Sequence, residues 1–147
     1  MLFRSDGVFR IQLVGHADRA AGPFRFQDQP IYDREQTEDA CIWFDRETGQ
    51  FNSLVHVMGR PVLARLVSED GVRWRAAEPF TFMPKEFVLA DGTTWKPKRF
   101  ERPFVLTDAA GRAECLYVAV IDGGLSGNIA IPLQRTRANA SASTAME

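Results

Sequence analysis

Two acidic segments of the chain lie 63 residues apart and share an order of residue types. Residues 38–45 and 101–108 each open on charged side chains, continue into an apolar stretch and end at an aspartate. Carboxylates that face each other across a pocket can hydrolyse a glycosidic bond, because a protonated one donates to the leaving oxygen while an ionised one activates water. Asp39 (or Glu38) and Glu101 are therefore candidate catalytic groups. With 19 acidic residues in the chain, the alternative is that they are ordinary surface carboxylates.

The elements that would position these carboxylates are short strands. Apolar runs bounded by Gly, Asp and Pro recur along the chain, and helical periodicity is nearly absent, so the pattern predicts an all-β fold. The expected strands are residues 9–13, 40–44, 53–58, 62–67, 104–106, 116–121 and 129–133. Residues 134–147, rich in Ala, Ser and Thr, are expected to be a disordered tail after a folded region of residues 1–133.

A second repeat has a period of 50 residues. Residues 17–24 and 67–74 each lead from a strand into a polar turn with Gly, followed by an aromatic residue, Phe24 or Trp74. Asp70-Gly71 is a strong hairpin signal because Gly adopts the positive φ that tight turns need. Units of about 50 residues with four short strands are typical of β-propeller blades, although hairpins of a β-sandwich could give a similar pattern. In a propeller, Asp39 and Glu101 would face each other at the central channel.

Composition narrows the class of protein. Hydrophobic residues make up 45% and charged residues 25% of the 147 residues, which is ordinary for a globular domain. The net charge of −1 gives no indication of binding to nucleic acid or a membrane. Cys41 and Cys115 lie in apolar runs without metal-ligand spacing and are interpreted as reduced core cysteines rather than a disulfide. No apolar run reaches the ~18 residues of a membrane helix and no signal peptide is evident, which leaves the localisation unknown.

Beside these patterns, several stretches resemble the five-bladed β-propeller hydrolases of glycoside hydrolase family 43 and the related family 117. Residues 37–43 (Thr-Glu-Asp-Ala-Cys-Ile-Trp) resemble their second acidic motif, and residues 100–106 (Phe-Glu-Arg-Pro-Phe-Val-Leu) resemble their later Glu-x-Pro motif. The turns at 17–24 and 68–74 resemble blade-edge turns, and residues 126–133 resemble a closing strand. The similarity runs from about residue 10 to residue 133 in the expected order.

This resemblance implies an incomplete five-bladed propeller of two and a half to three blades. It implies Glu101 as the general acid and Asp39 as the carboxylate that tunes the pKa of the acid and orients the substrate. The general base of such enzymes is an Asp in the first blade, for which this chain has no convincing equivalent. A full ring needs roughly 250–300 residues at about 50 per blade. We therefore expect a truncated chain that is inactive by itself.

Four further residues are candidate sugar ligands. His56 and Glu38 would lie near the channel, although His56 could equally be a hydrogen-bonded core residue. Trp95, in a Gly- and Lys-containing segment, could stack on a sugar ring. Asn128 could reach the substrate or only cap a turn.

Other residues are read as structural. His16 is expected to support a turn, and Arg102, next to Glu101 but on the opposite face of a strand, to pack or form an ion pair. No phosphate-binding loop, zinc spacing or Ser-His-Asp signature is present, so no cofactor is expected. Calcium occurs in some relatives of the resembled families, but no ligand cluster in the sequence identifies a site for it.

The sequence therefore leaves three hypotheses. The first is a glycoside hydrolase that acts on oligosaccharides or polysaccharides with inversion. The second is a non-catalytic carbohydrate-binding or structural propeller fragment. The third is a β-sandwich interaction domain, which would pack as two face-to-face sheets. Uncovered blade edges would favour self-association.

Overall fold

A computed structural model describes residues 2–5 and 10–133, and the side chains of residues 10–133. Every regular element in these residues is a strand, so the predicted all-β class is confirmed. The tail expected at residues 134–147 lies outside the described residues. The strands are β1 (Leu2–Ser5), β2 (Arg10–His16), β3 (Arg25–Pro30), β4 (Thr37–Asp45), β5 (Gln50–Val57), β6 (Val62–Ser68), β7 (Arg75–Pro84), β8 (Phe87–Val88), β9 (Thr94–Trp95), β10 (Arg99–Thr107), β11 (Ala113–Asp122) and β12 (Leu125–Pro132).

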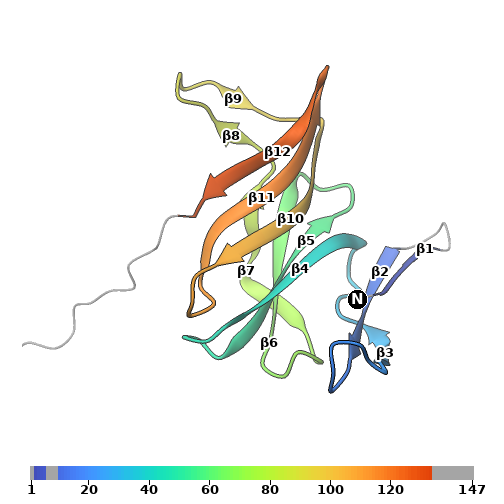
Figure 1. Ribbon diagram of the computed structural model, residues 1–147. Helices are drawn as coiled ribbons and strands as arrows, with labels where there is room; N and C mark the ends of the chain where they lie inside the picture. The colour runs from blue at the N-terminus through green and yellow to red at the C-terminus, as the bar shows by residue number, and fades with distance from the viewer. Residues whose placement is uncertain (1, 6–9, 134–147) are drawn as a thin grey trace, which may run out of the picture.

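The strands form antiparallel sheets in which neighbours in sequence are neighbours in space (Figure 1). We name them sheet I (β1-β2-β3), sheet II (β4-β5-β6-β7) and sheet III (β10-β11-β12), with a small β8-β9 hairpin between sheets II and III in the sequence. The strands expected from the sequence did not include this hairpin. The sequence also missed β1, β3 and β7, because the polar residues of β3 and the two prolines of β7 hide the strand pattern.

The central strands of sheet II, β5 and β6, are buried on both faces. In β5, Leu54 packs into one hydrophobic core with Leu116 and Val118 of sheet III, while its neighbour Val55 packs into another core with Val14 of sheet I. Successive side chains of a strand point to opposite faces, so a strand between two cores is buried at every position, whether the side chain is apolar or polar. This explains the uninterrupted burial of residues 52–57.

The 63-residue repeat corresponds to repeated structure. The β4-β5 and β10-β11 hairpins each carry a bulge near the start of the first strand, between Glu38 and Cys41 and between Glu101 and Phe104. Strands β4 and β10 are in contact. The backbone amide of Val105 donates to Cys41 Sγ at 3.3 Å, and both cysteines are free thiols.

The turns of the two repeated hairpins are also joined. The amide of Arg46 donates to the carbonyl of Ala110 at 2.9 Å. A Cβ added at Gly111 would lie 2.1 Å from the carbonyl oxygen of Phe44, so this contact requires glycine. The chain thus fixes the relative position of the strands that carry Asp39 and Glu101.

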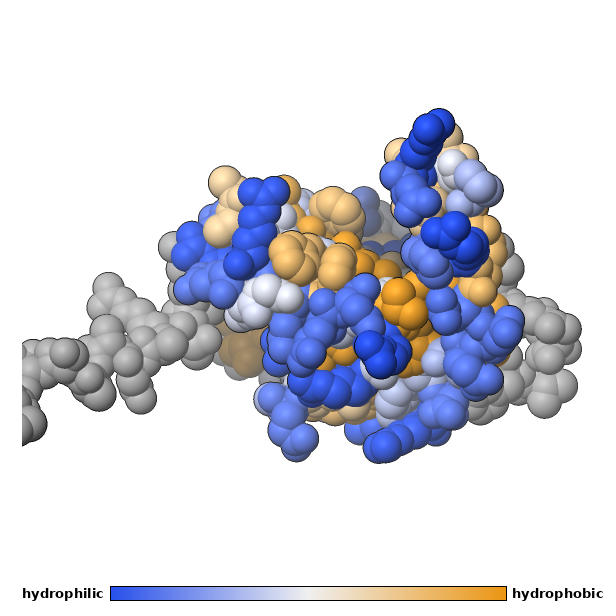
Figure 2. Space-filling view, turned by 90° about the horizontal axis from the view of Figure 1, so that it is seen from below, coloured by the Kyte–Doolittle hydropathy of each residue, from blue (hydrophilic) through white to orange (hydrophobic). Residues whose placement is uncertain are grey.

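No sheet closes on itself among the described residues, and a propeller ring is not shown. Apolar side chains also remain on the surface. Figure 2 shows hydrophobic surface between polar rims at the end of the molecule seen from below. On sheet III, Phe104 and Tyr117 have 58% and 39% of their surface exposed. This sheet therefore covers sheet II with one face while its other face carries exposed aromatic side chains.

Candidate functional site

Glu38, Asp39 and Glu101 lie where the two repeated strands bulge. A bulge inserts an extra residue and redirects the side chains around it. The extra residues here include Asp39 and Arg102, whose φ angles of 56° and 55° lie in the left-handed region. Glu38 and Glu101 precede them at matching positions.

Both acidic segments open onto one pocket of about 480 Å³, which we call the carboxylate pocket. Asp39 and Glu101, the two candidate catalytic residues, are both among the residues that line it. The residues that line the pocket are Arg10, Glu38, Asp39, Met58, Lys98, Arg99, Glu101 and Arg102.

Glu38 contacts side chains of the strands on either side of it, β2 and β5. Its Oε2 is paired with the guanidinium of Arg10 on β2, and its Oε1 lies 3.3 Å from Nδ1 of His56 on β5. The Arg10 amide also donates to Gln36 Oε1 at 3.0 Å, which joins sheet I to the segment before β4. With only 15% of its side chain exposed, Glu38 has little freedom to move.

His56 faces Glu38 directly across the β4-β5 pair. Burial lowers the pKa of His56, and the nearby Lys85 ammonium lowers it further, against the raising effect of Glu38, Glu101 and Asp39. The imidazole is therefore neutral at pH 7. Its Nδ1 is buried and makes no hydrogen bond, despite the proximity of Glu38. Of the predicted sugar ligands, His56 and Glu38 are thus at the site.

Lys85 is a residue that the sequence reasoning missed. It follows β7, where its backbone amide donates to the carbonyl of Pro61 at 2.8 Å. Burial lowers the pKa of Lys85, while Glu101, Glu38 and Asp39 raise it. The ammonium therefore belongs to the same electrostatic cluster as the three carboxylates. A lysine after a Met-Pro dipeptide gives no sequence signal for this placement.

Glu101 also lines a second pocket, of about 380 Å³, which we call the basic pocket. It shares Lys98, Arg99 and Glu101 with the carboxylate pocket, so the two pockets meet at the proposed acid. Both volumes fall within the range of small-molecule sites. The basic pocket is lined by His56, Arg60, Pro61, Val62, Pro84, Lys85, Glu86, Lys96, Pro97, Lys98, Arg99, Phe100 and Glu101.

Glu38, Asp39 and His56 could also hold a metal ion, since one donor atom of each lies within 4.8 Å of the others. The sequence did not reveal this cluster, because His56 is brought to the two acids only by the pairing of β4 with β5. Arg10 already neutralises Glu38, and the nearby Lys85 ammonium opposes a further cation. The charges therefore suit a metal ion poorly.

Trp95 and Asn128 are not brought to the site, as neither lines the carboxylate or the basic pocket. The indole of Trp95 donates to Asp122 Oδ2 at 2.6 Å and stacks on Phe87 with 5.6 Å between ring centres. Asn128 is exposed on β12, opposite Ala119. Trp95 therefore anchors the β8-β9 hairpin to sheet III.

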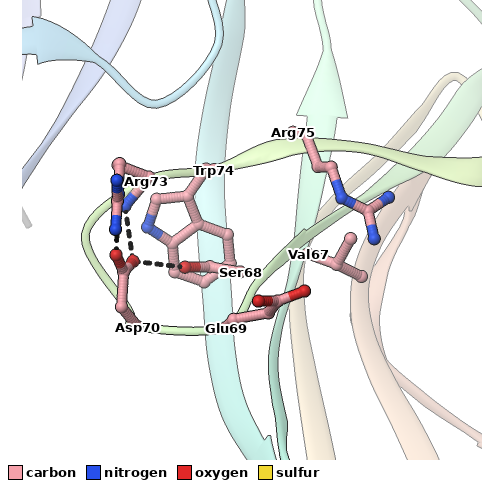
Figure 3. A pocket seen from close by; sticks show the side chains of 7 residues that line it. All are labelled: Val67, Ser68, Glu69, Asp70, Arg73, Trp74 and Arg75. Atoms are coloured by element: carbon pink, nitrogen blue, oxygen red, sulfur yellow. Dashed lines mark hydrogen bonds and ion pairs between the residues drawn. The ribbon is translucent and has the colours of Figure 1, made fainter.

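A pocket of about 310 Å³ beside the turn between β6 and β7 is structural (Figure 3). The Asp70 carboxylate accepts hydrogen bonds from the amides of Val72 and Arg73 at 2.9 and 2.8 Å, and these bonds hold its pKa far below the usual range. The indole of Trp74 donates to the carbonyl of Gly71 at 3.1 Å. The Asp-Gly signal thus identified a turn that satisfies its own polar groups.

Comparisons of the chain with models of protein families, with curated proteins and with solved structures gave no match in any of the three. Within the described part of the chain, no helix has the length and apolar character needed to cross a membrane.

Proposed function

We propose that the chain carries part of the catalytic site of a glycoside hydrolase. The observation that supports this most is the convergence of Asp39 and Glu101, from repeat-related bulged strands, on one pocket of about 480 Å³. Hydrolysis of a glycosidic bond uses carboxylates placed in this way. The resemblance of both segments to the acidic motifs of glycoside hydrolase families 43 and 117 supports the same function.

In this proposal Glu101 is the general acid. It lies at the boundary between the two pockets, so a sugar on each side would place the glycosidic oxygen beside its carboxyl group. Asp39 orients the substrate, and Glu38 supports this arrangement through its ion pair with Arg10. The reaction is proposed to invert configuration, and the water-activating base is assigned to none of the described residues.

The proposed architecture around the site is a five-bladed propeller. Sheet II has the four antiparallel strands of a blade, and sheets I and III pack on its two faces. The first strands of sheets II and III, β4 and β10, are in contact and carry the acidic groups. Neighbouring blades would place their innermost strands in this relation.

A second candidate function is non-catalytic carbohydrate binding. It is favoured by the fixed ion pair between Arg10 and Glu38. A carboxylate held by a guanidinium is suited to accepting hydrogen bonds from sugar hydroxyl groups rather than to transferring a proton. Both candidates place the sugar in the carboxylate pocket. They differ in whether a bond is broken.

Oligosaccharide binding and hydrolysis should therefore be measured on the same samples. We would screen arabino-, xylo- and galacto-oligosaccharides by calorimetry and chromatograph the products, using the wild type, Glu101→Gln and the control Glu69→Gln, an exposed residue of the β6-β7 turn. Because the described residues supply no base to activate water, azide is added as a nucleophile that needs none. With azide present, a hydrolase requires products from the wild type and the control, and a loss of at least about 100-fold in Glu101→Gln with binding retained. Binding without products in any sample assigns the binding module, and the absence of binding contradicts both functions.

A further inference from the structure

The chain has only three lysines, Lys85, Lys96 and Lys98, and all of them line the basic pocket. Arg60 and Arg99 line it as well, against two carboxylates, Glu86 and Glu101. The whole chain has a net charge of −1, so this gathering of cations is local. A concave surface lined by one sign of charge concentrates ligands of the opposite sign.

Ion pairs compensate some of these cations and leave others free. Lys96 pairs with Glu86 at 2.8 Å, and Arg60 pairs with Glu35 at 3.0 Å. Arg99 Nη1 lies 3.9 Å from Glu101 Oε2, which is a long distance for an ion pair. Among the residues that the structure describes, Lys85 and Lys98 have no carboxylate within ion-pair distance.

Lys85 is the most informative of the free cations. Burial lowers its pKa, which means that the folded chain bears a cost for keeping this ammonium charged. Long-range attraction to Glu101, Glu38 and Asp39 offsets part of that cost, but no partner makes direct contact. An anion in the pocket would supply the missing partner.

We propose that the basic pocket binds an anionic group, a carboxylate or a sulfate, on the sugar substrate of the site. This deepens the function proposed above, because the pocket adjoins Glu101 and an acidic sugar held there would present its glycosidic bond to that residue. The glycan is then a uronate or a sulfated sugar rather than a neutral one. Lys85 and Lys98 are the direct ligands in this proposal.

Binding is tested with three matched disaccharides: galactobiose, digalacturonate and a 6-sulfated galactobiose. Calorimetry at low salt should show at least tenfold tighter binding of one or both acidic sugars than of galactobiose, and the affinity should fall as salt is added. The acidic disaccharide that binds more tightly shows whether the pocket recognises a carboxylate or a sulfate. Equal affinity for all three sugars, or binding that is insensitive to salt, overturns the inference.

Variants locate the binding. Lys85→Met, which keeps an unbranched apolar side chain but removes the ammonium group, should weaken binding of the preferred acidic sugar at least tenfold and leave galactobiose unaffected. Arg75→Met is the matched control, since Arg75 is an exposed cation outside both pockets. An equal loss for the acidic and the neutral sugar in Lys85→Met would contradict the assignment.

Lysine acetylation of the wild type gives a measurement that does not depend on a variant folding. Acetic anhydride modifies three lysine side chains in this chain, all in the basic pocket. Mass spectrometry should show that the preferred acidic sugar slows modification of Lys85 and Lys98 several-fold and that galactobiose does not. If an acidic sugar binds but does not slow the modification of these lysines, the sugar binds elsewhere. That result overturns the inference.

The outcomes separate this inference from the proposed function. Selective binding of an acidic sugar without cleavage, even with azide present as the nucleophile, supports the anion pocket and contradicts the hydrolase. Hydrolysis of neutral oligosaccharides that depends on Glu101, without preference for acidic ones, supports the hydrolase and contradicts the anion pocket.

Discussion

Asp39 and Arg102 occupy matching positions in two strands, 63 residues apart, and both adopt a left-handed backbone, with φ angles of 56° and 55°. Each follows a glutamate at a β-bulge, Glu38 or Glu101. Left-handed φ is uncommon for residues other than Gly, and it is less costly for Asp than for Arg. The shared bulge thus turns both acidic segments toward one pocket.

The strain at Arg102 leads to a first prediction. Arg102→Gly should raise the free energy of unfolding by about 0.5 kcal/mol, because glycine adopts positive φ without a Cβ clash and this gain exceeds its loss of chain entropy. Arg75→Gly, at the exposed start of β7, should lower it by about 0.5–1 kcal/mol. Urea unfolding of both variants checks the contrast, and equal destabilisation would argue against the left-handed backbone at Arg102.

Gly111 and Gly49 give a second prediction. Both have positive φ, 82° and 67°, but a Cβ at Gly111 would meet the carbonyl of Phe44 whereas nothing lies within 4 Å of one at Gly49. Gly49→Ala should therefore cost about 1 kcal/mol through φ alone, and Gly111→Ala about 3 kcal/mol or more because the β4-β5 and β10-β11 turns must separate. Similar losses in the two variants, measured by urea unfolding, would mean that these turns are not in contact.

A third prediction concerns pH and His56. Because burial lowers the pKa of folded His56, the unfolded chain binds its proton first as the pH falls below about 6.5. Its neutral form therefore favours folding above that pH, and the free energy of unfolding decreases as the solution is acidified. His56→Gln should show a smaller decrease than the wild type between pH 8 and 5.5 in urea titrations. Parallel curves for the two proteins would contradict the burial of this imidazole.

Asp70 gives a fourth prediction. Its carboxylate accepts two backbone hydrogen bonds and also pairs with Nε of Arg73 at 2.9 Å. Asp70→Ala should lower the thermal midpoint clearly at pH 7. Asp18→Ala, in the corresponding turn, should have a smaller effect, since its side chain is 88% exposed and lies 3.5 Å from Arg25. Thermal scans in which the two variants behave alike would show that the hydrogen bonds of Asp70 contribute little.

The features predicted correctly from the sequence are those encoded over short distances. Apolar runs predicted the central strands, and the Asp-Gly dipeptide predicted the β6-β7 turn. The repeat of residues 38–45 at 101–108 predicted the paired hairpins. These signals arise from side-chain alternation and turn chemistry, which local sequence determines.

The sequence failed where pairing between distant residues decides the environment. His56 joins Glu38 and Asp39 only through strand register, and Lys85 reaches the site from the end of β7. Trp95, predicted to stack on a sugar, instead donates to Asp122, 27 residues away. Propellers and open stacks of sheets share the same local strand pattern, so the ring architecture remains a proposal.

A double-mutant cycle measures whether Asp39 and Glu101 act on one bound sugar. Calorimetry would give the affinity of the wild type, Asp39→Asn, Glu101→Gln and the double variant for the tightest-binding oligosaccharide. We predict a coupling free energy of about 1 kcal/mol or more between the two substitutions, as expected for residues that contact the same ligand. Additive effects, within about 0.3 kcal/mol, would contradict a shared site.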